Sequence, residues 1–104
     1  VQRDYAPARV FLTENGSTWD DVLLPDGRVE DARRVSYLAR HLAAARQALS
    51  KGVPLQGYFY WSLLDNFEWA EGYTRRFGLA YVDYGTQQRI LKASGHWYAR
   101  FLKG

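Results

Sequence analysis

Residues 57–64 read Gly-Tyr-Phe-Tyr-Trp-Ser-Leu-Leu and form an apolar run that does not alternate with charged side chains. A strand with one wet face alternates apolar and polar residues, whereas a strand covered on both faces is apolar throughout. The run is short and rich in aromatic residues, which is typical of a strand. We therefore expect residues 57–64 to be an inner strand with other elements packed on both of its faces.

The segment before this run predicts a helix. Its apolar residues recur at spacings of three and four, namely Val35, Leu38, Leu42, Ala45 and Leu49. Asp31 is expected to cap the N-terminus, and Gly52 is expected to end the helix in a left-handed conformation before Pro54. The arginines of this segment mostly fall outside the apolar stripe, and we interpret them as a solvated face: Arg33, Arg34, Arg40 and Arg46.

A first strand is predicted upstream of the helix. Residues 8–13, Ala-Arg-Val-Phe-Leu-Thr, predict a short buried strand that ends at Glu14-Asn15-Gly16, a turn signal. Strand, helix and strand in this order form a βαβ unit with parallel strands and a right-handed crossover. Two parallel strands leave unpaired backbone groups on both edges, so the pattern requires more strands than 104 residues contain. The chain, which has no methionine, is therefore expected to be a piece of a larger α/β protein.

The remaining segments predict a turn, a hairpin and a last helix. Pro25-Asp26-Gly27 is a β-turn sequence, and Asp65 and Asn66 are expected to shape the loop after the second strand. Residues 77–84 and 89–91 predict a small hairpin that Asp83 stabilises. Ser94 is expected to cap a final helix that buries the apolar side chains Trp97, Tyr98, Phe101 and Leu102.

Composition excludes several classes of function. The net charge is +3, but the arginines are scattered, so nucleic-acid binding is not indicated. The apolar runs are too short to span a membrane. The chain has no cysteine and only the distant His41 and His96, so no metal site and no cofactor are expected. The lack of cysteine suits a reducing compartment, and we expect the cytoplasm.

Polar and aromatic side chains follow both predicted strands. Thr13-Glu14-Asn15-Gly16 comes after the first strand, and the segment Trp61–Trp69 comes after the second. In parallel (β/α) barrels functional groups gather at the carboxyl ends of strands. Cleavage of a glycosidic bond needs two carboxyl groups, flat apolar surfaces and hydrogen-bonding groups for hydroxyls. Core packing is the alternative interpretation of the aromatic residues, ten of which lie between residues 58 and 84.

Two motifs carry a family resemblance. Phe-Leu-Thr-Glu-Asn-Gly at 11–16 and Trp-Ser-Leu-Leu-Asp-Asn-Phe-Glu-Trp at 61–69 resemble glycoside hydrolase family 1. The likeness continues through Gly72-Tyr73, residues 76–79 and residues 82–84, so it covers essentially all of residues 1–104. It implies an α/β fold that forms the C-terminal part of a TIM (β/α)8 barrel. The chain would supply the last two of the eight βα units, with a small hairpin after the eighth strand.

The resemblance also implies a role for each motif residue. Glu14 would be the nucleophile of a retaining β-glycosidase that works by double displacement, and it must be ionised to attack. Trp61 would lie under the sugar of the subsite where cleavage occurs. Glu68 would bind the hydroxyls at carbons four and six, Trp69 the hydroxyl at carbon three, and Phe77 would line the pocket near carbon six.

The same resemblance implies that the chain needs a partner. The acid/base carboxyl of the family lies in a Thr-Phe-Asn-Glu-Pro-like motif on an earlier strand, and these 104 residues contain no such motif. We expect the remainder of the barrel to be required for activity on a β-glycoside or oligosaccharide substrate. We expect the isolated chain to be inactive, marginally stable and prone to self-association, because apolar faces would be uncovered. A carboxylate at Glu68 would repel a phosphate, which favours unphosphorylated sugars.

Two other functions are compatible with a small domain of this composition. A non-catalytic sugar-binding protein would use Trp61 and Trp69 as its platform, but it gains little from a carboxylate such as Glu14. A basic nucleic-acid-binding domain would need arginines interleaved with the aromatic residues, and the sequence lacks such a cluster.

Overall fold

The computed structural model describes residues 2–67, 72 and 75–104. Its elements in chain order are α1 (Gln2–Tyr5), β1 (Val10–Asn15), α2 (Ala32–Ser50), β2 (Leu55–Tyr60), β3 (Ala80–Val82), β4 (Arg89–Leu91) and α3 (Ala93–Lys103).

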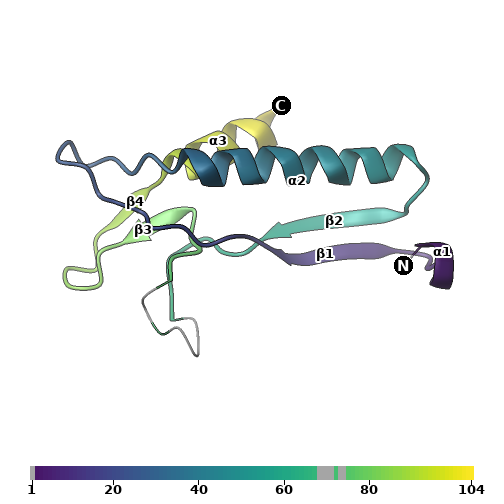
Figure 1. Cartoon of the computed structure of the whole chain (residues 1–104), viewed down its shortest axis with the longest axis horizontal. Coiled ribbons are helices and arrows are strands. Elements are labelled where there is room, and N and C mark those ends of the chain that lie inside the picture. Colours follow the sequence, from purple (N-terminus) through teal and green to yellow (C-terminus); the bar gives the residue numbers. More distant parts are fainter. Residues whose placement is uncertain (1, 68–71, 73–74) are drawn as a thin grey trace.

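The centre of the fold is the unit β1–α2–β2. The two strands pair in parallel, with Val10 opposite Leu55 and Asn15 opposite Tyr60, and the register is irregular between these ends. Figure 1 shows β1 and β2 side by side, with α2 and α3 both lying on one side of them. The strands point toward the end of the molecule where the β3–β4 hairpin and the start of α2 lie. The predicted βαβ unit with parallel pairing is confirmed.

The burial of the strands differs from the prediction. Residues 8–13 were expected to form a buried strand, but β1 runs over Val10–Asn15 and is mostly exposed. The second strand ends at Tyr60, so residues 61–64 belong to the following loop. Phe11 and Phe59 expose 51% and 56% of their surface. The reason is that the described strands β1 and β2 form a sheet of two strands, so little is packed against the side of the sheet that faces away from α2.

The predicted ends of α2 are confirmed, but its polar face is not. Asp31 is at the N-cap position, and Gly52 has a positive φ of 90°. No side-chain capping bond forms, because the Asp31 carboxylate instead accepts hydrogen bonds from Arg34 and Ser94. The prediction that Arg34 is solvated is wrong, since its side chain is fully buried. Arg33, Arg40 and Arg46 are exposed, as expected.

The hairpin and the last helix pack beyond the strands. β3 and β4 are antiparallel, and Oδ1 of Asp83 accepts hydrogen bonds from the backbone N–H groups of Gly85 and Thr86. Both features confirm the predicted hairpin. Ser94 does not cap α3: the N-cap is Lys92, and the Ser94 hydroxyl donates to Asp31. The starts of α2 and α3 lie close together, so the hydrogen bonds of Ser94 to Asp31 join the two helices.

The described residues bury few large side chains. The fully buried ones with the largest volumes are Arg34, Lys92, Leu38 and Ser94, three of which are polar. Among the described helices, none combines the length and apolar content that a membrane crossing needs.

Candidate active site

The carboxyl ends of β1 and β2 meet at one edge of the sheet. Glu14 is exposed near the end of β1, and Trp61 directly follows β2. The backbone N–H of Trp61 donates a hydrogen bond of 3.0 Å to the backbone carbonyl oxygen of Asn15, the neighbour of Glu14. The parallel register therefore brings the two segments that carry Glu14 and Trp61 into direct contact.

The two segments approach each other so closely that one position requires glycine. A Cβ atom on Gly16 would lie 1.8 Å from the carbonyl oxygen of Trp61, which is an impossible contact. The peptide bond that follows Trp61, to Ser62, is cis. Gly16, which was predicted to lie in a turn, is thus also the point where the two strand ends contact each other.

The side chain of Asn15 is hydrogen-bonded to two tyrosine hydroxyls. Its Oδ1 accepts a hydrogen bond from the hydroxyl of Tyr58 on β2. Its Nδ2 donates to the hydroxyl of Tyr37 on α2 at 3.2 Å, and that hydroxyl donates to the carbonyl oxygen of Gly16 at 3.0 Å. Elements β1, β2 and α2 therefore meet at the residue next to Glu14.

Phe77 lies close to the same edge. It is partly buried, and its carbonyl oxygen accepts hydrogen bonds from the Tyr60 hydroxyl at 3.2 Å and from the Ser62 N–H at 3.3 Å. The structure thus brings Glu14, Trp61 and Phe77 toward one end of the sheet. Glu68 and Trp69, the other two predicted site residues, lie outside the described residues.

Asp65 anchors the loop after β2. It was predicted to shape this loop, and it is 4% exposed. Its Oδ1 accepts from the Gly78 N–H at 2.9 Å and from Lys92 Nζ at 2.8 Å. Its Oδ2 accepts from Arg76 Nη1 at 2.6 Å and from the Val82 N–H at 3.3 Å. One carboxylate thus ties the loop to the hairpin and to the start of α3, which confirms the prediction.

A second buried carboxylate, Asp21, anchors the loop after β1. It forms a two-pronged ion pair with Arg34, both contacts being 2.9 Å, and it accepts from Lys92 Nζ at 2.6 Å. Lys92 therefore bridges the loop after β1 and the loop after β2. We call Asp21, Asp31, Arg34, Asp65, Arg76 and Lys92 the charge cluster.

The protonation of the buried groups follows from their surroundings. Burial opposes the charge of Arg34, but the hydrogen bonds and charges of Asp21 and Asp31 outweigh it and raise the pKa of the guanidinium. Burial raises the pKa of Tyr60 to about 12, although Arg34 pulls it down. Burial, with the neighbouring tyrosines, also raises the pKa of Tyr58. Both tyrosines therefore stay neutral hydrogen-bond donors at neutral pH.

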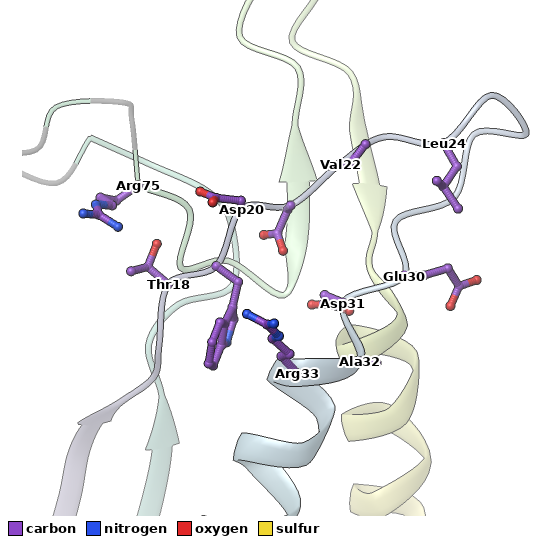
Figure 2. A pocket seen from close by; sticks show the side chains of 11 residues that line it. Thr18, Asp20, Val22, Leu24, Glu30, Asp31, Ala32, Arg33 and Arg75 are labelled. Carbon is purple, nitrogen blue, oxygen red and sulfur yellow. The ribbon is translucent and has the colours of Figure 1, made fainter.

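A cavity of about 470 Å³ lies beyond the end of β1, between the loop 18–24 and the start of α2. Figure 2 shows Thr18 and Arg75 at one side of it and Leu24 and Glu30 at the other. None of the predicted site residues that the structure describes lines this cavity. Its acidic and basic side chains balance once Asp21 and Asp31 are neutralised within the charge cluster, so it does not favour a charged ligand.

Several residues of this region have roles that the sequence did not predict. Asn15 was named only within the turn and the motif at 11–16, and Tyr37 lies in the predicted helix without a signal of its own. Asp31 and Arg34 stand three apart on a helix, a spacing at which opposite charges pair, and this could have identified Arg34 as a partner. Lys92 had no sequence signal, because its partners lie 71 and 27 residues away.

The chain is similar to known β-glucosidases. It is 57% identical to β-glucosidase A of Thermotoga maritima over 103 residues, which are 99% of this chain and 23% of that protein. It is 46% identical to a 6-phospho-β-galactosidase of Streptococcus equi subsp. zooepidemicus, over 94% of this chain and 21% of that protein. The chain thus spans about a quarter of the length of the relatives it matches.

Solved structures give the same result. The family 1 β-glucosidase from Thermotoga maritima in complex with isofagomine lactam superposes with a TM-score of 0.96, over 98% of this chain and 23% of that one. The family model described as glycosyl hydrolase family 1 matches residues 1–104. The chain therefore belongs to glycosyl hydrolase family 1.

Proposed function

We propose that the chain supplies the nucleophile and part of the sugar subsite of a retaining β-glycosidase. The observation that carries this proposal is the hydrogen bond between Trp61 and Asn15 at the end of the parallel strands. It puts the exposed carboxylate-bearing residue Glu14 on the segment that contacts Trp61, an aromatic side chain that is 38% exposed. An accessible carboxylate beside an accessible aromatic face is what a glycone subsite needs.

The proposed reaction has two steps at one carboxylate. Glu14 attacks the anomeric carbon, forming an ester bond while the bond to the leaving oxygen breaks, and an acid protonates that oxygen. Water then attacks the same carbon, losing its proton to the now basic partner, and Glu14 leaves as a carboxylate. The acid/base residue would come from outside these 104 residues, as would the remaining strands of the (β/α)8 barrel.

The proposed substrate is an unphosphorylated β-glycoside. Glu68 is the basis of this choice, because a carboxylate near carbon six would repel a phosphate dianion. Trp69 would contribute an indole N–H, and Phe77 an apolar wall. The relatives named above include both a β-glucosidase and a 6-phospho-β-galactosidase, so family membership alone does not choose between the two kinds of substrate.

We further propose that residues 1–104 form one part of a single barrel domain, the last two βα units. Support comes from the βαβ unit with its parallel strands and from the uncovered side of its sheet. The cytoplasm stays the predicted location.

The test is a chimera in which this chain replaces the segment that it matches in β-glucosidase A of Thermotoga maritima. We expect the chimera to hydrolyse an aryl β-glucoside and the isolated chain to be inactive. Glu14→Gln in the chimera should reduce turnover by about 10⁴-fold or more, because it removes the nucleophile. A 2-fluoro glucoside should label Glu14, as read by mass spectrometry of the peptides.

Three outcomes would contradict the proposal. Turnover by the isolated chain that Glu14→Ala abolishes would reveal an acid/base residue within these 104 residues. A folded chimera that binds glucose in a calorimetric titration but never hydrolyses the glucoside would favour a sugar-binding protein. Faster hydrolysis of the aryl 6-phosphoglucoside than of the aryl glucoside would refute the assignment of Glu68.

A further inference from the structure

The strand end that carries Glu14 is fixed from the helical layer. Tyr37 lies on α2, and its hydroxyl is within hydrogen-bonding distance of both residues that follow Glu14. It accepts from the Asn15 side chain and donates to the Gly16 carbonyl oxygen. A single phenolic hydroxyl thus holds one side chain and one backbone group of the turn.

The hydrogen-bond directions in this group are consistent in one orientation of the Asn15 amide. The Tyr37 hydroxyl has one proton, which the Gly16 carbonyl oxygen requires as its donor. The amide atom that faces Tyr37 must therefore be the nitrogen, and the oxygen faces the hydroxyl of Tyr58. Burial raises the pKa of Tyr58, so this hydroxyl stays a donor.

Asn15 and Gly16 also contact Trp61. The backbone carbonyl oxygen of Asn15 accepts a hydrogen bond from the backbone N–H of Trp61, and Gly16 lies against the Trp61 carbonyl oxygen. Tyr37 itself is held in place by His41, whose ring stacks on it with centroids 3.9 Å apart. Asn15 therefore connects the segment that carries Glu14 to the segment that carries Trp61.

We propose that Tyr37 is a positioning residue that, through Asn15 and Gly16, holds the Glu14 carboxylate at the distance from the anomeric carbon that attack requires. The inference rests on the proposed function, in which Glu14 is the nucleophile. Positioning acts on the rate of the covalent step, because a small displacement of a reacting group reduces the rate steeply. It leaves the initial binding of the sugar largely unchanged.

The experiment is the inactivation of the chimera by a 2-fluoro glucoside, comparing Tyr37→Phe with the parent. We expect the rate constant of inactivation to fall about tenfold, in line with the loss of a hydrogen bond at the transition state, while the inhibition constant changes less than about twofold. The rate constant per labelled site does not depend on the fraction of folded protein, so a purely structural role would not change it.

Two further variants sharpen the result. Tyr98→Phe is the control, since the Tyr98 hydroxyl makes no hydrogen bond with another described residue, and its inactivation rate should equal that of the parent. In an Asn15→Ala background, Tyr37→Phe should reduce the rate by clearly less than tenfold, because part of its effect passes through Asn15.

The outcomes separate the inference from the proposed function. Labelling of Glu14 at equal rates in the parent and in Tyr37→Phe overturns the inference and leaves the proposed function standing. A full tenfold effect of Tyr37→Phe in the Asn15→Ala background, with an unchanged inhibition constant, also overturns the inference and leaves the proposed function standing. A parent chimera whose Glu14 is never labelled overturns both.

Discussion

The sheet and the charge cluster lie next to each other but are covered very differently. On the sheet, Phe11 and Phe59 each expose more than half of their surface, although they are the kind of side chain that proteins bury. In the charge cluster, Arg34 and Lys92 are fully buried although charged residues are almost never buried unless paired. In the charge cluster every carboxylate is paired with a cation, although Nε of Arg34 is buried without a hydrogen-bond partner, whereas on the sheet large apolar side chains stay uncovered.

The two regions differ in which groups find partners among the described residues. Every carboxylate of the charge cluster finds its cation within the chain, from loops, α2 and the start of α3. The rings of Phe11 and Phe59 both lie near Gly57, and each side chain is more than half exposed. The ion pairs that join the loops are therefore complete within the described residues, whereas the apolar side chains of the sheet are uncovered among them.

The largest effect is expected where the charge cluster is broken. Lys92→Met in the chimera should lower the free energy of unfolding by about 4 kcal/mol, because Asp21 and Asp65 both lose a buried cation. Thermal or urea unfolding measures it. The control is Lys103→Met in the exposed last turn of α3, which should change stability by less than about 0.5 kcal/mol. A value near the control for Lys92→Met would show that the cluster is solvated.

A somewhat smaller effect is expected on the sheet. Phe59→Ala should lower the stability of the chimera by about 3 kcal/mol, as for a covered aromatic side chain. In the isolated chain the same substitution should instead reduce self-association, because Phe59 is exposed there. Sedimentation measures the second result. A parent chain that sediments as a monomer and melts cooperatively would contradict this view of the sheet.

Gly16, where the two strand ends contact each other, should not tolerate a side chain. Gly16→Ala should lower the stability of the chimera by about 2 kcal/mol and reduce turnover, because the new Cβ would overlap the Trp61 carbonyl oxygen. Gly85→Ala is the control, since the nearest atom to its new Cβ would be 3.4 Å away. Equal unfolding midpoints for the two variants would refute the close approach.

High pH should weaken the fold through Tyr60. Its pKa is raised from 10.0 to about 12, so the folded state keeps a proton that the unfolded chain loses. The stabilisation is complete below pH 10 and is lost as the pH rises from 10 to about 12. Urea unfolding between pH 9 and pH 12 should show a shallower loss of stability for Tyr60→Phe than for the parent. Parallel curves would contradict the assigned shift.

The smallest effect is expected at the exposed turn. Arg28 and Asp26 form an ion pair of 2.8 Å, but both side chains are at least half exposed. Exposed pairs contribute little, because water and salt screen them. Arg28→Gln should leave the thermal midpoint unchanged within error, and a clear decrease would show that the turn belongs to the charge cluster.

Local patterns in the sequence predicted the elements but not their burial. The spacing of Leu38 and Leu42, together with Gly52, was sufficient for α2, because periodicity and capping are local. Arg34 was assigned to solvent because its position was compared only with the apolar stripe; the spacing to Asp31 was a local sign of pairing, whereas the contact with Asp21, 13 residues upstream, was not. The strand run 8–13 on its own was expected to be buried, but the lack of further strands already predicted uncovered apolar faces, and β1 is exposed.

For the candidate site, the sequence likewise predicted the motif residues but not the residues that support them. The strand pattern placed Glu14 at a strand end, whereas Trp61 fell inside the predicted strand 57–64 and follows β2 in the structure; parallel pairing brings the two segments together. Tyr37 could not be predicted, because its position beside Asn15 depends on how α2 crosses the sheet. Roles that depend on one residue follow from motifs, whereas supporting roles follow from packing between distant segments.

The carboxylate of Asp31 has a consequence for the order of events during synthesis. It accepts hydrogen bonds from Ser94, which is 63 residues farther along the chain. Lys92 and Ser94 are therefore synthesised after α2, and until then Asp21 and Asp31 lack part of their hydrogen-bonding partners. Closing so long a loop is slow and entropically costly. The buried polar interior can thus form only after translation has passed the start of α3, and in a chain that stops short of residue 92 the loops after β1 and β2 would lack the lysine that joins them.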